Sequence, residues 1–336
     1  MIKEVIAELI EGKDLTREKM QAVFEEIMKA EVTPAQIAGL LVALRIKGET
    51  PEEITGAALA MRKFVKRVNT PEDVVLDTCG TGSDRSLTFN ISTVCAFVAA
   101  GAGLVVAKHG NRAVSSHCGS ADLLEALGIN INIDESKAEE CLKAVGISFL
   151  FAQTLHPAMK FAAGVRKELG VRTIFNLLGP LTNPAFATHQ LLGVYDLKLL
   201  KPLAEVLKAL SVKHALVVHG MDGLDEVTTC GETAVCELNK GKIRSYKISP
   251  DDFGLKKAKI EDLQGGSAAT NADIAREILQ GAKGPKRDII LLNAGCAIYA
   301  ADKAKTIKEG IKLAQESIDS GRAFSKLDEL RKFTTM

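Results

Sequence analysis

The chain has 336 residues, with 43 lysines and arginines against 42 aspartates and glutamates, so its formal net charge is +1. A balance this even argues against a nucleic-acid-binding stripe or a membrane-surface patch, and the length is sufficient for a large core in two lobes. The seven cysteines form no Cys-x-x-Cys pair, and the chain has neither a secretory apolar region nor an apolar run of about 18 residues. We therefore expect a cytoplasmic protein with reduced thiols.

Residues 1–70 have the sequence pattern of helices. Thr33 and Thr50 are each followed by a proline and, three positions on, by a glutamine or a glutamate, which is the capping-box pattern with proline at the first helical position. Thr16 is placed to cap a further helix, and Gly48 lies where a helix is expected to end. These helices carry apolar faces but no group of reactive side chains, which favours a scaffold or a subunit interface.

A glycine-rich turn follows the short apolar run at 74–76. Gly80 and Gly82 lead through polar residues to the apolar segment 94–100, an order typical of strand, turn and helix N-terminus. Glycines let the backbone approach a ligand closely, and a helix N-terminus favours anions. The turn lacks Gly-Lys-Ser/Thr, and Arg85 occupies the third glycine position of a dinucleotide fingerprint, so neither motif is present. Taken alone, the turn fits a plain connection as well as a phosphate site.

A second polar loop, at 108–116, follows the predicted strand 104–107 and brings Lys108, Arg112 and hydroxyl groups. The carboxyl ends of parallel strands meet at one edge of a sheet, and ligands of such sheets bind there. Two loops of this kind, one strand apart, therefore predict a site for a polyanion rather than for a lone phosphate.

Strand and helix patterns alternate from Val74 onward. Further strands are predicted at 215–219 and 234–238, and helical segments run from 271 to the C-terminus. Alternation of this kind predicts an α/β fold with a mainly parallel sheet and helices on both of its faces.

Several motifs together resemble the anthranilate phosphoribosyltransferase family, and the resemblance covers nearly the whole chain. Its specific parts are the second loop and an Asp-Glu pair, whereas Ser83 stands where relatives usually have glycine. The motifs are Gly80-Thr81-Gly82-x-Asp84, Thr88-Phe89-Asn90-Ile91-Ser92-Thr93, Lys108-His109-Gly110-Asn111-Arg112, Gly119-Ser120-Ala121-Asp122, His156-Pro157, Arg166, the segment 176–184 and Asp225-Glu226-Val227.

The resemblance implies a small N-terminal all-helical domain and a larger α/β domain whose mainly parallel sheet is flanked by helices. The helical domain would comprise 1–70, joined by helices from about 157–185, and would cover the active site and form a homodimer. The α/β domain, 71–336, would bind 5-phosphoribosyl 1-diphosphate (PRPP). The implied reaction transfers the phosphoribosyl group of PRPP to the amine of anthranilate and releases pyrophosphate, with Mg²⁺ as cofactor, in a step of L-tryptophan biosynthesis. No nucleic-acid or membrane partner is expected.

The residues that the resemblance implies for PRPP lie in the two loops and at the starts of the following helices. Taken singly, Ser92 and Ser120 are better explained as plain helix N-caps, since serine is a preferred cap residue. The implied residues are Gly80, Ser83, Asp84, Thr88, Asn90, Ile91, Ser92, Thr93, Lys108, His109, Gly110, Asn111, Arg112, Ala113, Val114, Ser115, Ser116 and Ser120.

Ser92, Asp225 and Glu226 are the implied Mg²⁺ ligands. Adjacent carboxylates suit Mg²⁺, a hard cation that takes one or two carboxylates together with substrate oxygens and waters. From spacing alone, two solvated acids in a loop would be the simpler interpretation, and only the family match favours the metal.

For anthranilate the resemblance implies Gly80, His109, Asn111, His156, Arg166 and Pro180. Arg166 could bind the carboxylate with two hydrogen bonds, or it could be a cation favoured by the dipole at a helix C-terminus. For the two histidines, a structural role explains the sequence as well as contact with the substrate does. An aromatic amine is largely unprotonated near neutrality, so no strong general base is required and we assign no catalytic acid or base.

Two other functions remain open at this point. A pyrimidine nucleoside phosphorylase shares the implied fold and would use free phosphate and a nucleoside, but the 108–112 loop and the Asp225–Glu226 pair argue against it. A non-catalytic relative that binds nucleic acid would need a basic stripe, which the net charge of +1 does not support.

Overall fold

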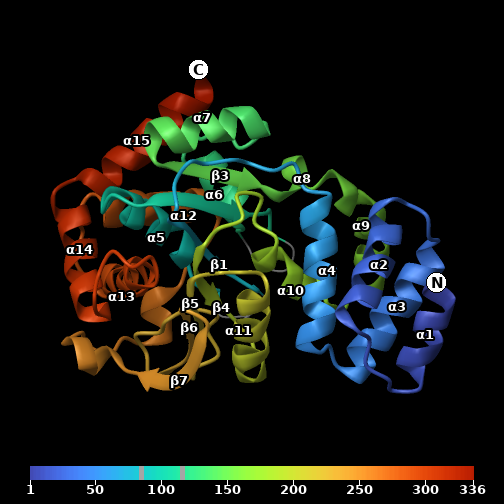
Figure 1. Cartoon of the computed structure of the whole chain (residues 1–336). Helices are drawn as coiled ribbons and strands as arrows, with labels where there is room; N and C mark the ends of the chain where they lie inside the picture. The colour runs from blue at the N-terminus through green and yellow to red at the C-terminus, as the bar shows by residue number, and fades with distance from the viewer. Residues whose placement is uncertain (83–86, 114–117) are drawn as a thin grey trace.

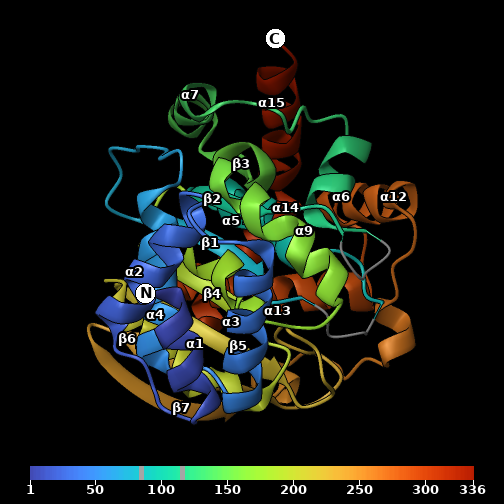
Figure 2. The ribbon, with the colours of Figure 1, turned by 90° about the vertical axis from the view of Figure 1, so that its right-hand side faces the viewer.

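The computed structural model of the chain describes residues 1–82, 87–113 and 118–336. Figure 1 shows a group of helices that begins at the N-terminus beside a larger part in which helices surround a sheet. Figure 2, turned by 90°, shows the N-terminal helices in front of the strands. The predicted fold class is confirmed, with an all-helical N-terminal part and an α/β part with a mainly parallel sheet. Within the described ranges, no helix is long and apolar enough to cross a membrane.

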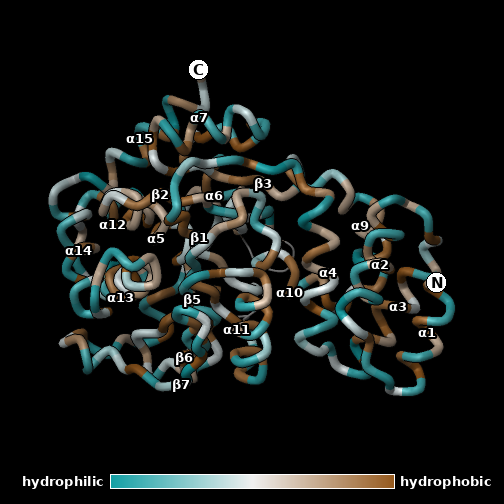
Figure 3. The backbone as a smooth tube through the Cα atoms, viewed as in Figure 1, coloured by the Kyte–Doolittle hydropathy of each residue, from teal (hydrophilic) through white to brown (hydrophobic). Residues whose placement is uncertain are grey.

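The N-terminal helices begin where the sequence predicts. They are α1 (Ile2–Ile10), α2 (Arg17–Met28), α3 (Pro34–Lys47) and α4 (Pro51–Lys63). The Thr16 side chain accepts a hydrogen bond from the Lys19 amide, and Thr33 and Thr50 both form complete capping boxes. The tube in Figure 3 changes repeatedly between hydrophobic and hydrophilic colours along these outer helices, as amphipathic helices with one buried face require.

Two helices from the middle of the chain pack against this group. α9 (Lys160–Leu169) contacts α2 and α3, and α10 (Phe175–Leu178) contacts α4. The rings of Phe24 and Phe175 have their centroids 5.5 Å apart. The helix expected to start at Pro157 begins instead with a 3₁₀ turn, Pro157–Met159, and continues as α9.

Seven strands form one sheet in the order β3-β2-β1-β4-β5-β6-β7. The strands β3, β2, β1, β4 and β5 pair in parallel, and β6 and β7 extend the sheet antiparallel. The predictions at 215–219 and 234–238 are confirmed as β5 and β6. The bounds are β1 (Val75–Gly80), β2 (Val105–Gly110), β3 (Ile147–Phe151), β4 (His189–Gly193), β5 (His214–Gly220), β6 (Thr233–Asn239) and β7 (Lys242–Ile248).

β2 continues further than the predicted strand 104–107. Lys108, His109 and Gly110 belong to the strand and not to the loop that follows it. Lys108 is only 4% exposed, because its ammonium donates to the carbonyl oxygen of Thr78 on β1 at 2.5 Å. The predicted strand ended too early because Lys108 and His109 are polar, and the sequence does not show that Lys108 has a partner on β1.

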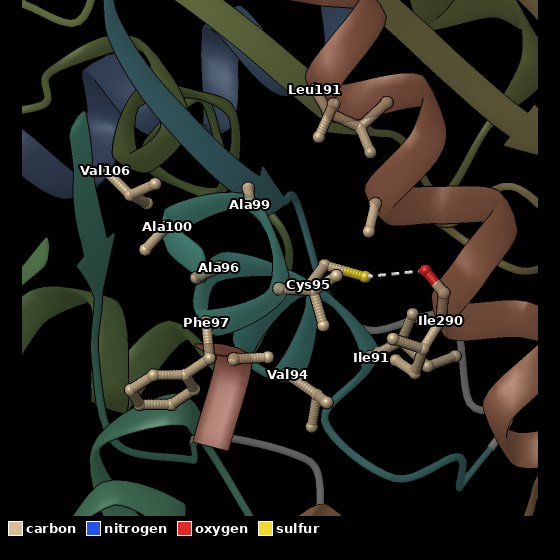
Figure 4. Packing of buried hydrophobic residues seen from close by; sticks show 14 of the residues in the cluster. Ile91, Val94, Cys95, Ala96, Phe97, Ala99, Ala100, Val106, Leu191 and Ile290 are labelled. Atoms are coloured by element: carbon tan, nitrogen blue, oxygen red, sulfur yellow. Dashed lines mark hydrogen bonds between the residues drawn. The ribbon is translucent and has the colours of Figure 1, made fainter. Parts of the chain in front are cut away.

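Helices cover both faces of the sheet. Leu191 and Leu216 belong to a hydrophobic core with α5, α13, α14 and α15, whereas the next residues along their strands, Leu192 and Val217, belong to a core with α11 and the helical part. Figure 4 shows α5 inside the first core, where the Cys95 thiol donates to the carbonyl oxygen of Ile290. The bounds are α5 (Ile91–Gly101), α6 (Ser120–Ala126), α7 (Glu135–Val145), α8 (Ala152–Leu155), α11 (Leu200–Ala209), α12 (Ala268–Leu279), α13 (Pro285–Ala300), α14 (Ile307–Asp319) and α15 (Arg322–Thr335).

The strand order reverses between β1 and β4. From β1 the chain moves outward through β2 to β3, and it then returns to the other side of β1 as β4. In open α/β sheets a crevice forms outside the carboxyl ends of the strands at such a reversal. Here those ends are Gly80 and Gly193, so the topology places the crevice beside the glycine-rich turn.

Candidate active site

One cavity of about 840 Å³ lies at this crevice, and every described candidate residue lines it. Five predicted residues, Ser83, Asp84, Val114, Ser115 and Ser116, lie outside the described residues. The candidates that line the cavity are Gly80, Thr88, Asn90, Ile91, Ser92, Thr93, Lys108, His109, Gly110, Asn111, Arg112, Ala113, Ser120, His156, Arg166, Pro180, Asp225 and Glu226.

The glycine-rich turn packs directly on the acidic pair. The Gly82 amide donates to Oδ2 of Asp225 at 2.7 Å. A Cβ atom at Gly80 would lie 2.5 Å from the same oxygen, and one at Gly193 would collide with the Asp225 backbone. The glycines at the ends of β1 and β4 are therefore needed for the close approach of Asp225, which is itself only 9% exposed.

The Glu226 side chain contacts the start of α5. Its Oε1 accepts a hydrogen bond from the Ser92 amide at 3.2 Å. The two carboxylates thus touch the turn and the helix N-terminus, and they are not solvated acids in a remote loop. The described residues contain no group of three or more His, Cys, Asp or Glu side chains arranged for a metal. Two carboxylates and a hydroxyl do fit Mg²⁺, which completes its shell with substrate oxygens and waters.

The two serines are not N-caps. Asn90 is the N-cap of α5, and Ser92 is the second residue of that helix. Gly119 is the N-cap of α6, and its amide donates a hydrogen bond to the Asp122 carboxylate. Ser120 is the first helical residue. The N-cap interpretation of Ser92 and Ser120 is therefore wrong, and both hydroxyl groups border the cavity.

Asn90 fixes the start of α5 through its side chain. The Asn90 amide group donates to the Cys118 carbonyl oxygen at 2.9 Å, and its Oδ1 accepts from the Asn271 side chain at 2.9 Å. The second loop, the start of α5 and α12 are held together by this one residue.

Lys108, near the end of β2, contributes a charged group to the lining of the cavity. Its ammonium carries three N–H donors and forms a single hydrogen bond within the described part of the chain, to Thr78. Since Lys108 lines the cavity, the remaining donors are available to a ligand there.

Arg112 already has acidic partners. Its guanidinium forms two hydrogen bonds with Glu125, one of them at 2.8 Å, and a third with Asp122 at 3.2 Å. These carboxylates raise the pKa of Arg112 above its ordinary value. A phosphate at Arg112 would have to displace or share these contacts.

His109 and His156 are buried neighbours, with ring centroids 5.1 Å apart. His109 Nδ1 lies 3.0 Å from the Gly179 carbonyl oxygen, so this nitrogen carries the proton. Nε2 of both rings is buried and has no hydrogen-bond partner among the described residues. Burial lowers the pKa of His156 to about 4 and that of His109 well below its ordinary value. Both rings are neutral, and both can accept hydrogen bonds through Nε2.

Arg166 occupies the last turn of α9, and its guanidinium lies 5.1 Å from the centroid of the Phe175 ring. Burial lowers its pKa, although no shift would discharge an arginine near neutrality. The helix-terminus interpretation and the cavity interpretation are both consistent with this position. The second explains why the neighbouring Lys167 is exposed and Arg166 is not.

Several cavity residues were not predicted. Met61 comes from α4, Gln153 from α8, and Lys160 from the first position of α9. Asn176 and Thr182 lie in the segment 176–184, and its resemblance to the family was the only signal for them. Met61 carries no sequence signal, because a methionine on a helix is usually a core residue.

The chain matches two parts of one family along most of its length. Residues 3–65 match the glycosyl transferase family helical bundle domain, and residues 72–324 match the glycosyl transferase family a/b domain. An anthranilate phosphoribosyltransferase of Clostridium kluyveri is 54% identical over 330 residues, which cover 98% of both chains.

Solved structures agree with this match. The anthranilate phosphoribosyltransferase of Thermus thermophilus is 45% identical, with a TM-score of 0.94 that covers 98% of this chain and 99% of that one. The enzyme of Saccharomyces cerevisiae, in complex with PRPP and Mg, is 29% identical, with a TM-score of 0.91 and coverage of 99% and 98%. The same yeast enzyme in complex with 4-fluoroanthranilate is 28% identical, with a TM-score of 0.90 and coverage of 99% and 97%. The chain therefore belongs to the anthranilate phosphoribosyltransferases, a family of pentosyltransferase enzymes, as its motifs predicted.

Proposed function

We propose that this chain transfers the phosphoribosyl group of PRPP to the amine of anthranilate and releases pyrophosphate, as a step of L-tryptophan biosynthesis. The observation that carries the proposal is that one cavity joins two phosphate-type loops and an acidic pair to two neutral imidazoles and an arginine. Neither half alone would distinguish this reaction from other uses of a phosphoribosyl donor.

The donor half binds and orients PRPP. The Ser92 and Thr93 side chains and the Lys108 ammonium supply donors for phosphate oxygens. Bond breaking at C1 of the ribose leaves negative charge on the pyrophosphate. Donors fixed before the reaction stabilise that charge without reorganising.

Asp225, Glu226 and the Ser92 hydroxyl are the residues that would hold Mg²⁺. Bound there, Mg²⁺ would neutralise charge on the pyrophosphate as it leaves. The Gly82 and Ser92 amides donate hydrogen bonds to the two carboxylates and hold them at this edge of the sheet.

The acceptor half binds anthranilate. Arg166 lines the cavity and would bind the carboxylate, and Asn111, Gly80 and Pro180 line the same cavity. His109 and His156 line the cavity and would border the bound anthranilate. Because both imidazoles are neutral, they do not repel the positive charge that develops on the ribose.

We also propose a cytoplasmic homodimer formed through the helical part. Three apolar side chains are exposed on its outer helices: Ile10 on α1, and Val42 and Ile46 one turn apart on α3. Ile46 is 82% exposed. A second copy that covers this face would remove these side chains from water.

The decisive experiment follows anthranilate fluorescence with PRPP and Mg²⁺ present. Loss of fluorescence that needs all three components supports the proposal. Phosphorolysis of a pyrimidine nucleoside without turnover of anthranilate would support the rival phosphorylase, and retention of nucleic acid without turnover would support a binding protein. Light scattering of the same sample tests the dimer.

A further inference from the structure

Asp77 is a fully buried carboxylate directly behind the cavity, on β1, and it does not line the cavity. Its Oδ1 accepts a hydrogen bond from the His109 amide at 3.2 Å. Its Oδ2 accepts from the side-chain amide of Asn183 at 2.8 Å. The two oxygens therefore hold two different segments of chain, the end of β2 and the segment that contains Asn183.

The Lys108 ammonium is the charged group that acts on Asp77. Burial raises the pKa of this carboxyl, while the nearby Lys108 ammonium, the Asn183 amide and the His109 amide act to lower it. A buried carboxylate without such partners would cost several kcal/mol. Lys108 is on the same strand as His109, so the carboxylate both fixes the backbone of β2 and attracts its charged side chain.

Asn183 links Asp77 to the segment that borders the acceptor. Its side-chain amide also donates to the Ala107 carbonyl oxygen at 2.8 Å, and its Oδ1 accepts from the Ala185 amide at 2.8 Å. The same segment includes Pro180, whose carbonyl oxygen accepts from Gln190 on β4. The wall that borders the acceptor is thus tied to the strands through buried side chains.

We infer that Asp77 is a positioning residue that fixes the end of β2, which carries Lys108 and His109, relative to the 179–183 segment. The inference rests on the proposed function, which assigns Lys108 in the first of these segments to PRPP, and His109 together with Pro180 in the second segment to anthranilate. Asp77 would touch neither substrate. Its effect on the reaction would pass through the Lys108 ammonium and the His109 ring.

The test compares Asp77→Asn with a matched control, Glu237→Gln. Glu237 is also a fully buried acid, it accepts hydrogen bonds from several side chains, and it lies outside the cavity. We expect Asp77→Asn to raise KM for PRPP about tenfold and to lower kcat about tenfold, the size of one hydrogen bond to a charged group. Glu237→Gln should lower the melting temperature and leave KM and kcat within about twofold of the parent values.

A second variant covers the case in which Asp77→Asn does not fold. Asn183→Ala removes one of the two links and should change KM for PRPP and kcat in the same directions, by about threefold. Direct titration of the folded protein with PRPP and Mg²⁺ gives the donor affinity without turnover.

Normal kinetics in Asp77→Asn together with a lower melting temperature would overturn the inference, as would equal kinetic losses in Glu237→Gln. If the parent protein turns over no anthranilate, the proposed function fails, and the titration of the parent and Asp77→Asn with PRPP still decides whether Asp77 positions the end of β2.

Discussion

The two edges of the sheet use the same kinds of side chain in opposite ways. At the edge where the parallel strands begin, the buried Glu237 accepts hydrogen bonds from His214 at 3.2 Å, Tyr246 at 2.7 Å, Tyr299 at 2.9 Å and Arg244 at 2.9 Å. At the edge where they end, His109 and His156 each keep a buried Nε2 without a partner among the described residues. The polar groups of the first cluster are satisfied within the protein, whereas these two histidine nitrogens at the second edge are not.

The pKa values follow the same division. His214 lies between two carboxylates, Glu237 and Asp302, which together raise its pKa. His109 and His156 lie against backbone carbonyl groups and apolar walls, and burial lowers the pKa of both. A saturated cluster stabilises the fold, whereas an unsaturated one is costly unless a substrate completes it. The two unpartnered nitrogens, which belong to residues that line the cavity, are therefore consistent with a ligand site at the second edge.

The largest expected effect comes from the acidic pair. Asp225→Asn with Glu226→Gln removes charge with little change in shape, and we expect turnover to fall by roughly a hundredfold or more and the Mg²⁺ requirement to rise. Steady-state kinetics over a Mg²⁺ titration measure both effects. Glu232→Gln, an exposed acid paired with Lys247, is the control and should behave as the parent does. An unchanged rate and Mg²⁺ dependence in the double variant would mean that the pair is only structural.

Arg166→Ala should raise KM for anthranilate about tenfold or more. The loss of a hydrogen bond to a charged group costs about 1.5–3 kcal/mol, and each 1.4 kcal/mol is about tenfold in affinity. The exposed neighbour Lys167→Ala should leave KM unchanged, because its charge serves only the helix C-terminus. A defect confined to KM for PRPP would refute the assignment of Arg166 to the acceptor.

His214→Asn tests the opposite edge. The raised pKa means that the stabilisation from charged His214 is complete below pH 6.5 and is lost as the pH rises through the folded-state pKa. The pKa of Glu237 is lowered to about 2, so its contribution is complete above pH 4.5 and is lost as the pH falls toward that value. We expect the variant to lose about 2 kcal/mol of unfolding free energy at about pH 5.5 and less at about pH 8.5, measured in urea. An equal loss at both pH values would show that His214 is neutral.

Glu125→Gln should have the smallest effect and should improve binding. Glu125 holds the guanidinium of Arg112, so its removal leaves Arg112 more available to a phosphate. We expect KM for PRPP to fall by about threefold. Asp328→Asn, which alters a remote pair with Arg331, is the control. A rise in KM would mean instead that Glu125 positions Arg112 for the donor.

Local features of the fold could be predicted from the sequence. The capping boxes at Thr33 and Thr50 were predictable because all of their partners lie within one helical turn. The strand β1 and its glycine turn were visible for the same reason. β2 was predicted too short at Lys108, since the hydrogen bond that its buried ammonium forms is to another strand.

The site was predictable as a set of residues and not as an arrangement. The contact between Gly82 and Asp225 joins positions 143 apart in sequence, and the contact between Asp77 and Asn183 joins positions 106 apart. Both depend on the register of β1 with β4 and on the packing of the 176–184 segment. The motifs named Asp225 and did not reveal Asp77, whose pattern is that of any acid within a strand.

The difference between the two edges is tested most directly by the gain in unfolding free energy when PRPP and Mg²⁺ are added. A ligand at about a hundred times its Kd stabilises the folded state by about 2.7 kcal/mol. We predict the full gain for the parent protein and for His214→Asn, which starts from a lower stability, and little gain for the Asp225→Asn, Glu226→Gln double variant. An equal gain in the double variant, or a lost gain in His214→Asn, would contradict the assignment of ligand binding to one edge and stability to the other.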